Sequence, residues 1–364
     1  MQLQNILDAL EQISPTALQE DFDNCGLLVG RRQTDITGIL LCIDVSEQVI
    51  DEAKQHGCNL IISHHPLIFR GLKSITGRNE VERCVIAAIK NDIAIYASHT
   101  CMDSVWGGVS FRMGEKLGLH DMQVLVPQQQ KLLKLVTFVP TAHLATVREA
   151  LFAAGAGHIG RYDACSYASE GHGTFRAGAD THPFCGTVGE LHTEPETRLE
   201  VILPKFRQTA VVSALLRAHP YEEPAFDLIA LENTWPMAGL GVVGNLPESM
   251  DETDFLQRLK QTFGTDAVKH SPLLGRPVRR IALCGGSGAD FIADAKAAKA
   301  DVYVTADVTY HRFFEAENRL VIADIGHFES EQFTKEIFFE QLSKKIPNFA
   351  IRLAESEPKR VLVH

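Results

Sequence analysis

Imidazole and carboxylate side chains follow three segments of this sequence that have the pattern of buried β-strands. His64 and His65 come directly after the first segment, and Asp103 lies shortly after the second. His327 follows the third, and Glu331, four residues later, would lie on the same side of a helix. Imidazole nitrogens and carboxylate oxygens are ligands of borderline divalent ions, and a carboxylate can bridge two of them. We call these residues the five-residue cluster: His64, His65, Asp103, His327 and Glu331.

Five ligands of these types suit two divalent metal ions, and they admit zinc, manganese, iron, cobalt or nickel. A two-metal site lowers the pKa of water and polarises the group under attack, so hydrolysis is the chemistry that we expect. Simpler interpretations exist for each pair. His64 and His65 would point oppositely on an extended backbone, and a histidine and a glutamate four residues apart can stabilise a helix start. The convergence on strand ends favours the metal site.

Two further histidines are candidate catalytic residues. His99 lies four residues before Asp103, close enough in one turn to orient it or to move a proton. His311 lies four residues after Asp307 and could support the metal ligands from behind, or it could lie on a solvated helix face.

A glycine-rich segment, Cys-Gly-Gly-Ser-Gly at residues 284–288, joins a predicted strand to a predicted helix. Its backbone N–H groups could hold a phosphate at the helix N-terminus. The segment lacks the P-loop lysine and the full dinucleotide fingerprint, so a structural turn is the alternative interpretation.

The strands that carry these residues belong to two expected parallel sheets. The first set comprises residues 38–45, 59–62 and 93–97, separated by helical stretches in a βαβαβ order. The second set comprises residues 280–284, 302–305 and 320–324, with helices at 288–298 and 330–344. Because open α/β sheets bind ligands at the carboxyl ends of their strands, three strand ends are expected to supply one site.

The pattern changes between these two sets. Residues 131–232 predict the βαββαβ order of a split ferredoxin-like unit, within which residues 169–187 read as a long loop or hairpin. A chain of 364 residues exceeds one ordinary core, and an inserted domain is the simplest account. We therefore expect an N-terminal lobe at 1–125, an inserted domain at 126–234 and a C-terminal lobe at 235–364.

Composition limits the class of protein and its partners. Hydrophobic residues make up 45% and charged residues 22%, the balance of a folded chain that dissolves in water. The net charge of −11 argues against nucleic acid or an anionic membrane as a partner. Eight scattered cysteines without a Cys-x-x-Cys pair indicate neither a zinc ribbon nor a disulfide framework. With no basic residue before Arg31 and no long apolar run, we expect a cytoplasmic protein.

Four motifs in this order make the chain similar to a known family. They are Ser63-His64-His65-Pro66, His99-Thr100-x-x-Asp103 with Gly107-Gly108, Thr305-x-Asp307 with His311, and Gly326-His327-x-x-x-Glu331. Together they resemble the interacting-factor-3-like family, whose members often carry the name GTP cyclohydrolase 1 type 2 homologue. The resemblance spans residues 1–125 and 235–364. Ala306 and Ser110 depart from the family pattern, and neither is a proposed ligand.

The resemblance implies an α/β fold: a two-lobed core of parallel and mixed sheets around a dinuclear site. The five-residue cluster would supply the ligands, with Glu331 as the bridge, and the protein would form a toroidal homohexamer. The middle segment resembles the extra domain of longer members, similar to small trimeric signalling and copper-tolerance proteins of ferredoxin-like fold. Its glycine-rich motifs could simply permit tight turns, or the domain could cover the metal site, with His158 or His219 facing the cavity.

We therefore expect a metal-dependent hydrolase that acts on a small nucleotide-like or phosphorylated substrate. A GTP cyclohydrolase opens a purine ring and would have to recognise guanine. No residue pattern in the sequence indicates a guanine-binding site. The alternative is a non-enzymatic metal-handling or regulatory assembly, in which the inserted domain senses a ligand or docks a protein. Tightly held ions with an open coordination position would favour catalysis, whereas ready ion exchange without turnover would favour the alternative.

Overall fold

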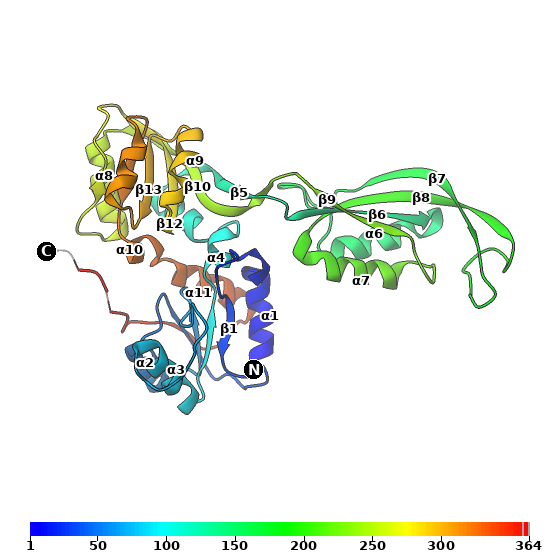
Figure 1. Cartoon of the computed structure of the whole chain (residues 1–364), viewed down its shortest axis with the longest axis horizontal. Helices are drawn as coiled ribbons and strands as arrows, with labels where there is room; N and C mark the ends of the chain where they lie inside the picture. Colours follow the sequence, from blue (N-terminus) through cyan, green and yellow to red (C-terminus); the bar gives the residue numbers. More distant parts are fainter. Residues whose placement is uncertain (359, 363–364) are drawn as a thin grey trace. The chain divides into compact units, whose positions relative to one another are not determined.

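The computed structural model describes residues 1–358 and 360–362, and it divides the chain into two compact units (Figure 1). The first unit comprises Met1–Val126 and Met237–His364, and the second comprises Pro127–Pro236. One continuous segment therefore separates the two parts of the first unit. The fold is mixed α/β, with two sheets in the first unit and one in the second.

The first sheet has the strand order β1-β4-β3-β2-β15. Its strands are β1 Gly26–Val29, β2 Ile39–Cys42, β3 Leu60–Ser63, β4 Ala94–Ala97 and β15 Ile351–Leu353. The neighbours β15, β2, β3 and β4 pair in parallel, and β1 pairs with β4 in the antiparallel direction. The expected parallel pairing of the first strand set is confirmed, while β1 and β15 had no clear signal in the sequence.

Local sequence explains the strands and helices of this sheet. Strands β2, β3 and β4 are buried along their whole length, as expected for parallel strands covered on both faces. The helices of this part are α1 Leu3–Ile13, α2 Glu47–Gln55, α3 Glu80–Lys90, α4 Thr100–Ser104 and α5 Val109–Leu117, with a 3₁₀ turn η1 at Thr16–Leu18. The Ser46 hydroxyl accepts a hydrogen bond from the Val49 N–H, so Ser46 is the N-cap of α2.

The second sheet has the strand order β11-β14-β13-β12-β10-β5. Its strands are β5 His120–Gln128, β10 Trp235–Met250, β11 Lys269–His270, β12 Val278–Ser287, β13 Val302–Ala306 and β14 Val321–Asp324. Strands β12, β13 and β14 are parallel as predicted, whereas β10 and β11 pair antiparallel with β12 and β14. The sheet is therefore mixed.

The helices around the second sheet differ in number and bounds from the two that the sequence pattern predicted. They are α8 Glu252–Phe263, η4 Ala289–Phe291, α9 Ile292–Ala297, η5 Tyr310–Ala316, α10 His327–Glu331 and α11 Thr334–Lys345. The helix expected over 330–344 begins three residues earlier, at His327, and is interrupted between α10 and α11. Helix α11 and strand β15 then return to the first sheet, so the end of the chain completes the core of the N-terminal part.

The second unit has the element order β6-α6-β7-β8-α7-β9 and an antiparallel sheet of order β7-β8-β6-β9. Its elements are β6 Leu132–Pro140, η2 Thr141–His143, α6 Leu144–Ala153, β7 Tyr167–Arg176, β8 Leu191–Pro204, η3 Lys205–Arg207, α7 Gln208–Ala218 and β9 Phe226–Leu231. Both helices cover the same face of the sheet (Figure 1). The segment expected as a loop or hairpin was 169–187. Its first part, residues 169–176, lies in β7, which forms an antiparallel hairpin with β8.

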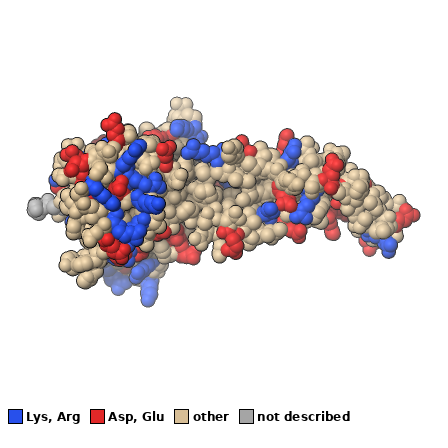
Figure 2. Space-filling view, turned by 90° about the horizontal axis from the view of Figure 1, so that it is seen from above, with Lys and Arg blue, Asp and Glu red and all other residues tan. Residues whose placement is uncertain are grey.

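Three further properties concern the helices, the cysteines and the charged surface. Among the described residues, no helix is both long and apolar enough to cross a membrane. The eight cysteines are free thiols in the structure. Figure 2 shows lysine and arginine side chains gathered on part of the face in view, with aspartate and glutamate beside them, so charges of both signs share this surface.

Replacing Phe338 by alanine is expected to lower the free energy of unfolding by about 3–5 kcal/mol, because its ring in α11 is fully buried in the core of the first sheet. The neighbouring Phe339 is 41% exposed, and Phe339→Ala is expected to change stability by less than about 1 kcal/mol. Chemical denaturation followed by circular dichroism measures both variants. Equal losses would contradict the packing of α11 on this sheet.

Candidate metal centre

The strand ends of both sheets in the first unit bring the five-residue cluster together. His64 and His65 directly follow β3, and Asp103 lies in α4, which begins three residues after β4. His327 and Glu331 are the first and last residues of α10, which follows β14. The helix start at His327 places these two side chains one turn apart on one face.

Glu331 lies at the centre of the cluster and faces three imidazoles. Its Oε1 lies 3.6 Å from Nε2 of His64, and its Oε2 lies 2.9 Å from Nε2 of His65 and 3.1 Å from Nε2 of His327. Asp103 Oδ1 lies 3.8 Å from Nε2 of His64. Ligands that share an ion at about 2.0–2.1 Å lie roughly 3.0–3.5 Å from each other. The separations within the cluster, from 2.9 to 3.8 Å, lie within about 0.3 Å of this range, so small side-chain movements would bring these atoms around a common cation.

Two atoms of the cluster, His64 Nε2 and Asp103 Oδ1, are among the described side-chain atoms that are buried without a hydrogen-bond partner. Buried polar atoms are normally paired, so convergent lone pairs without donors fit a site for a cation. Two groups of side chains could hold a metal ion here. They share His65: one contains His64, His65 and His99, and the other contains His65, His327 and Glu331.

Each imidazole is held at its Nδ1 by an acceptor outside the cluster. The Nδ1 separations are 2.9 Å for His65 and Asp44, 2.6 Å for His327 and Asp307, 2.9 Å for His99 and Asp23, and 3.1 Å for His64 and the Ser98 carbonyl. An acceptor at Nδ1 selects the tautomer and orients the ring, which leaves Nε2 available as a ligand atom.

Two of these acceptors were not found from the sequence. Asp44 comes two residues after β2, so the same strand-end rule that identified His64 could have found it. Asp23 precedes the antiparallel strand β1, where that rule does not apply, and it reaches His99 only through the fold.

The electrostatics of the cluster favour positive charge. Burial opposes the protonated imidazole, but hydrogen bonds with Asp44 and Glu331 outweigh it and raise the pKa of His65 to about 10. Burial is likewise outweighed at His327, where Glu331 contributes most to raising the pKa to about 9. Burial alone would raise the pKa of Glu331, yet attraction to His64 and hydrogen bonds with the imidazoles hold it well below its usual range. A divalent cation would take the place of the imidazole protons.

The two candidate catalytic histidines lie in different surroundings. The ring of His99 lies 5.3 Å from the rings of both His64 and His65, so it lies beside the five-residue cluster and could itself be a ligand. His311 is exposed on η5, where its imidazole ring contacts the aromatic rings of Tyr310 and Phe314. The structure thus brings His99 to the cluster, while His311 remains a prediction.

The glycine-rich segment at 284–288 forms a turn that serves the cluster. The N–H of Gly286 donates to Ser330 Oγ and that of Gly288 to Thr305 Oγ1, each at 2.9 Å, so these two groups are already used. Gly286 has φ +64°, and a Cβ there would clash with Oε1 of Glu331. These contacts favour the structural turn over a phosphate cradle.

Comparison with known proteins gives matches over nearly the whole chain. The family model Duf34/NIF3 (NGG1p interacting factor 3) matches residues 1–360. A protein of Halalkalibacterium halodurans named GTP cyclohydrolase 1 type 2 homolog is 41% identical over 94% of this chain and 92% of its own. A Bacillus subtilis protein of the same name is 40% identical over 92% and 90%. The crystal structure of a Bacillus cereus protein related to NIF3 superposes with a TM-score of 0.87 at 37% identity, covering 100% of this chain and 99% of that one.

Asp44→Asn is expected to weaken binding of a divalent cation at the cluster by about 10- to 100-fold, because His65 would lose the carboxylate that orients its ring. Asp51→Asn is the matched control, since Asp51 is exposed on α2 and pairs with Lys54 at the surface. Competition with a chelating dye measures both affinities. Equal affinity in the two variants would remove the orienting role of Asp44.

Proposed function

Because this chain belongs to the DUF34/NIF3 family, we propose that its five-residue cluster binds two divalent metal ions per subunit and that the protein is a metal-dependent hydrolase. The observation that carries the proposal is the position of Glu331, a buried carboxylate within 3.6 Å of three imidazole nitrogens. A carboxylate with one oxygen toward His64 and the other toward His65 and His327 is suited to bridge two ions.

The donor set defines the chemistry of the site. Three imidazoles and two carboxylates provide nitrogen and oxygen ligands only, which zinc, manganese, iron, cobalt and nickel all accept. When bound, a pair of such ions would supply Lewis acidity and a nucleophilic water at neutral pH. The ligand imidazoles are fixed by Asp44, Asp307 and the Ser98 carbonyl, so the site is organised in advance.

His99 is the residue that we propose for proton transfer. Asp23 accepts hydrogen bonds from the Thr100 N–H and hydroxyl and lies 2.9 Å from His99 Nδ1. Although burial would raise the pKa of Asp23, its hydrogen bonds with His99 and Thr100 hold it well below the usual range. A carboxylate that stays ionised can orient the imidazole and stabilise its protonated form. His311, exposed on η5, is kept as a candidate for proton exchange with solvent.

The substrate class that we propose is a small nucleotide-like or phosphorylated molecule. The names of the relatives point to nucleotide chemistry in those proteins. The N–H groups of Gly286 and Gly288 already donate to side-chain acceptors, so we assign recognition of phosphate oxygens to metal ions at the five-residue cluster instead of to the glycine-rich turn.

The second unit fits the ferredoxin-like domain that we propose for residues 126–234. Its order β6-α6-β7-β8-α7-β9, its sheet order β7-β8-β6-β9 and its two helices on one face are the arrangement of a split βαβ unit. The cytoplasmic location and the homohexamer also remain proposals. Exposed aromatic side chains on η5, Tyr310 at 73% and Phe314 at 65%, are candidates for a subunit interface.

Elemental analysis is expected to find close to two more metal ions per subunit in the purified wild type than in the double variant His65→Ala, Glu331→Ala. The control is His56→Ala, Glu248→Ala, which removes the same residue types from exposed positions. Circular dichroism verifies that each variant is folded. A wild type without metal after reconstitution would refute the dinuclear site.

Hydrolysis is tested by incubating protein loaded with each of the five metals with a panel of phosphoesters, amides and cyclic amidines. We expect turnover of at least one class, and His99→Gln is expected to reduce kcat about 10²- to 10⁴-fold with metal content unchanged. Loss of metal in His99→Gln would instead make His99 a ligand. Ready ion exchange without turnover of any panel member would favour a metal-handling or regulatory assembly.

A further inference from the structure

A second group of potential metal ligands lies in the second unit, far along the chain from the five-residue cluster. Cys185, His192 and Glu194 each offer one ligand atom, and these atoms all lie within 4.8 Å of one another. His192 and Glu194 are two residues apart on β8, so they point to the same face of the strand. Cys185 comes from the segment that joins β7 to β8 and folds back onto that face.

This face of the sheet is the one not covered by helices. Leu199, Val201 and Leu203 of β8 point to the opposite face and pack in the core with α6 and α7. His192 and Glu194 therefore belong to the exposed side of the sheet, where a ligand can approach without disturbing the core.

The three side chains are held close together by local contacts. His192 Nε2 lies 2.8 Å from Glu194 Oε2, and the Phe175 ring packs on the imidazole at 5.3 Å. Gly186 has φ +81°, and a Cβ there would lie 2.9 Å from Cβ of His192. A glycine beside Cys185 thus lets the loop approach the imidazole. The arrangement is fixed by a strand pair and a tight loop turn, so little ordering would be needed on binding.

We propose that Cys185, His192 and Glu194 bind one zinc ion, in a site separate from the five-residue cluster. Thiolate, imidazole and carboxylate are the ligands that zinc takes in proteins, and three protein ligands leave a fourth position open. The thiolate distinguishes this site from the nitrogen and oxygen donors of the first unit and selects a softer ion.

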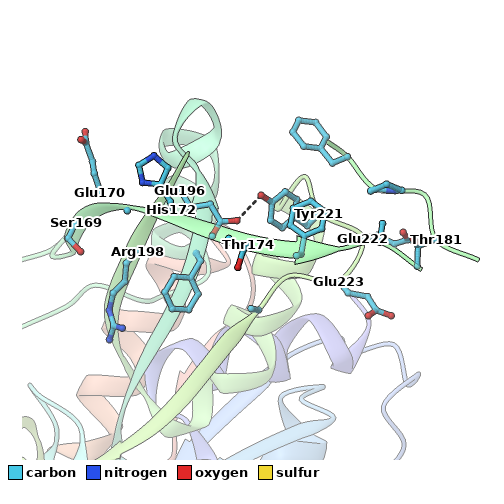
Figure 3. Close-up of a pocket in the computed structure, with 18 residues that line it drawn as sticks. Ser169, Glu170, His172, Thr174, Thr181, Glu196, Arg198, Tyr221, Glu222 and Glu223 are labelled. Carbon is cyan, nitrogen blue, oxygen red and sulfur yellow. Dashed lines mark hydrogen bonds between the residues drawn. The ribbon is translucent and has the colours of Figure 1, made fainter. Parts of the chain in front are cut away.

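A cavity lies beside these three side chains. It has a volume of about 660 Å³, and its lining includes Phe175 and Tyr221 (Figure 3). Phe175 also packs on His192, and Tyr221 lies within hydrogen-bond reach of Cys185, so the cavity adjoins the site. Figure 3 shows Tyr221 pointing toward Glu196. The Tyr221 hydroxyl donates a hydrogen bond to Glu196 Oε1, with 2.7 Å between the two oxygens.

Cobalt(II), added alone to the full chain under reducing conditions, is the probe, because a thiolate ligand gives a near-ultraviolet charge-transfer band. We expect this band in the wild type, its displacement by zinc, and its loss in Cys185→Ser. Cys165→Ser, which removes another partly buried thiol of the same unit, should retain the band. His192→Ala leaves the thiol in place and should weaken cobalt binding at this site by at least about tenfold.

The two metal sites are distinguished by the variant His65→Ala, Glu331→Ala, which should retain the thiolate band. Circular dichroism establishes that Cys185→Ser is folded, and His192→Ala tests the same site independently. A wild type without the band at saturating cobalt, or a folded Cys185→Ser variant that keeps it, would overturn the proposal. In that case the three side chains would be a hydrogen-bonded group without a metal.

Discussion

The carboxylate of Glu331 is the group on which the arrangement of the first unit depends. It is 2% exposed, and it faces the nitrogens of His64, His65 and His327. A buried carboxylate is costly unless positive charge lies against it, and three imidazoles alone supply that charge only when protonated. The surrounding backbone is shaped to admit this group, since Gly286 leaves room for its Oε1. A cation shared by these residues satisfies the carboxylate and the neutral imidazoles together.

This constraint links the two sheets of the first unit. His64 and His65 come from the end of β3 in the first sheet, whereas His327 and Glu331 come from the end of β14 in the second. Neither sheet alone assembles the donor set, so binding energy at the cluster would stabilise the contact between them. The C-terminal segment reinforces this contact without metal, because α11 and β15 leave the second sheet and pack on the first.

The sequence predicted those features that depend on local pattern. The parallel strands were visible as short apolar runs, and the residues of the five-residue cluster were visible because parallel strands bring their carboxyl ends to one edge. The start of α10 at His327 was missed because its first turn carries no N-cap side-chain hydrogen bond, and Gly326 with φ +94° precedes it. The predicted order required a strand at the place of β7, but glycines and histidines of low strand propensity hid its bounds; it pairs with β8 along its full length. Asp23 meets His99 across 76 residues of chain, a contact that no local pattern encodes.

Contacts between residues far apart in the sequence also explain why the cysteines did not indicate a metal site in the sequence. A search for closely spaced cysteine pairs finds local zinc motifs, but Cys185 has no second thiol nearby and meets His192 and Glu194 only because the segment after β7 turns back. The two groups of ligands also differ in what they can select. Nitrogen and oxygen donors admit several ions, so occupancy of the five-residue cluster would follow which metal is available. A thiolate narrows that choice, and the chain would then respond to two metals, or to one metal over two ranges of concentration, according to the donor atoms of each site.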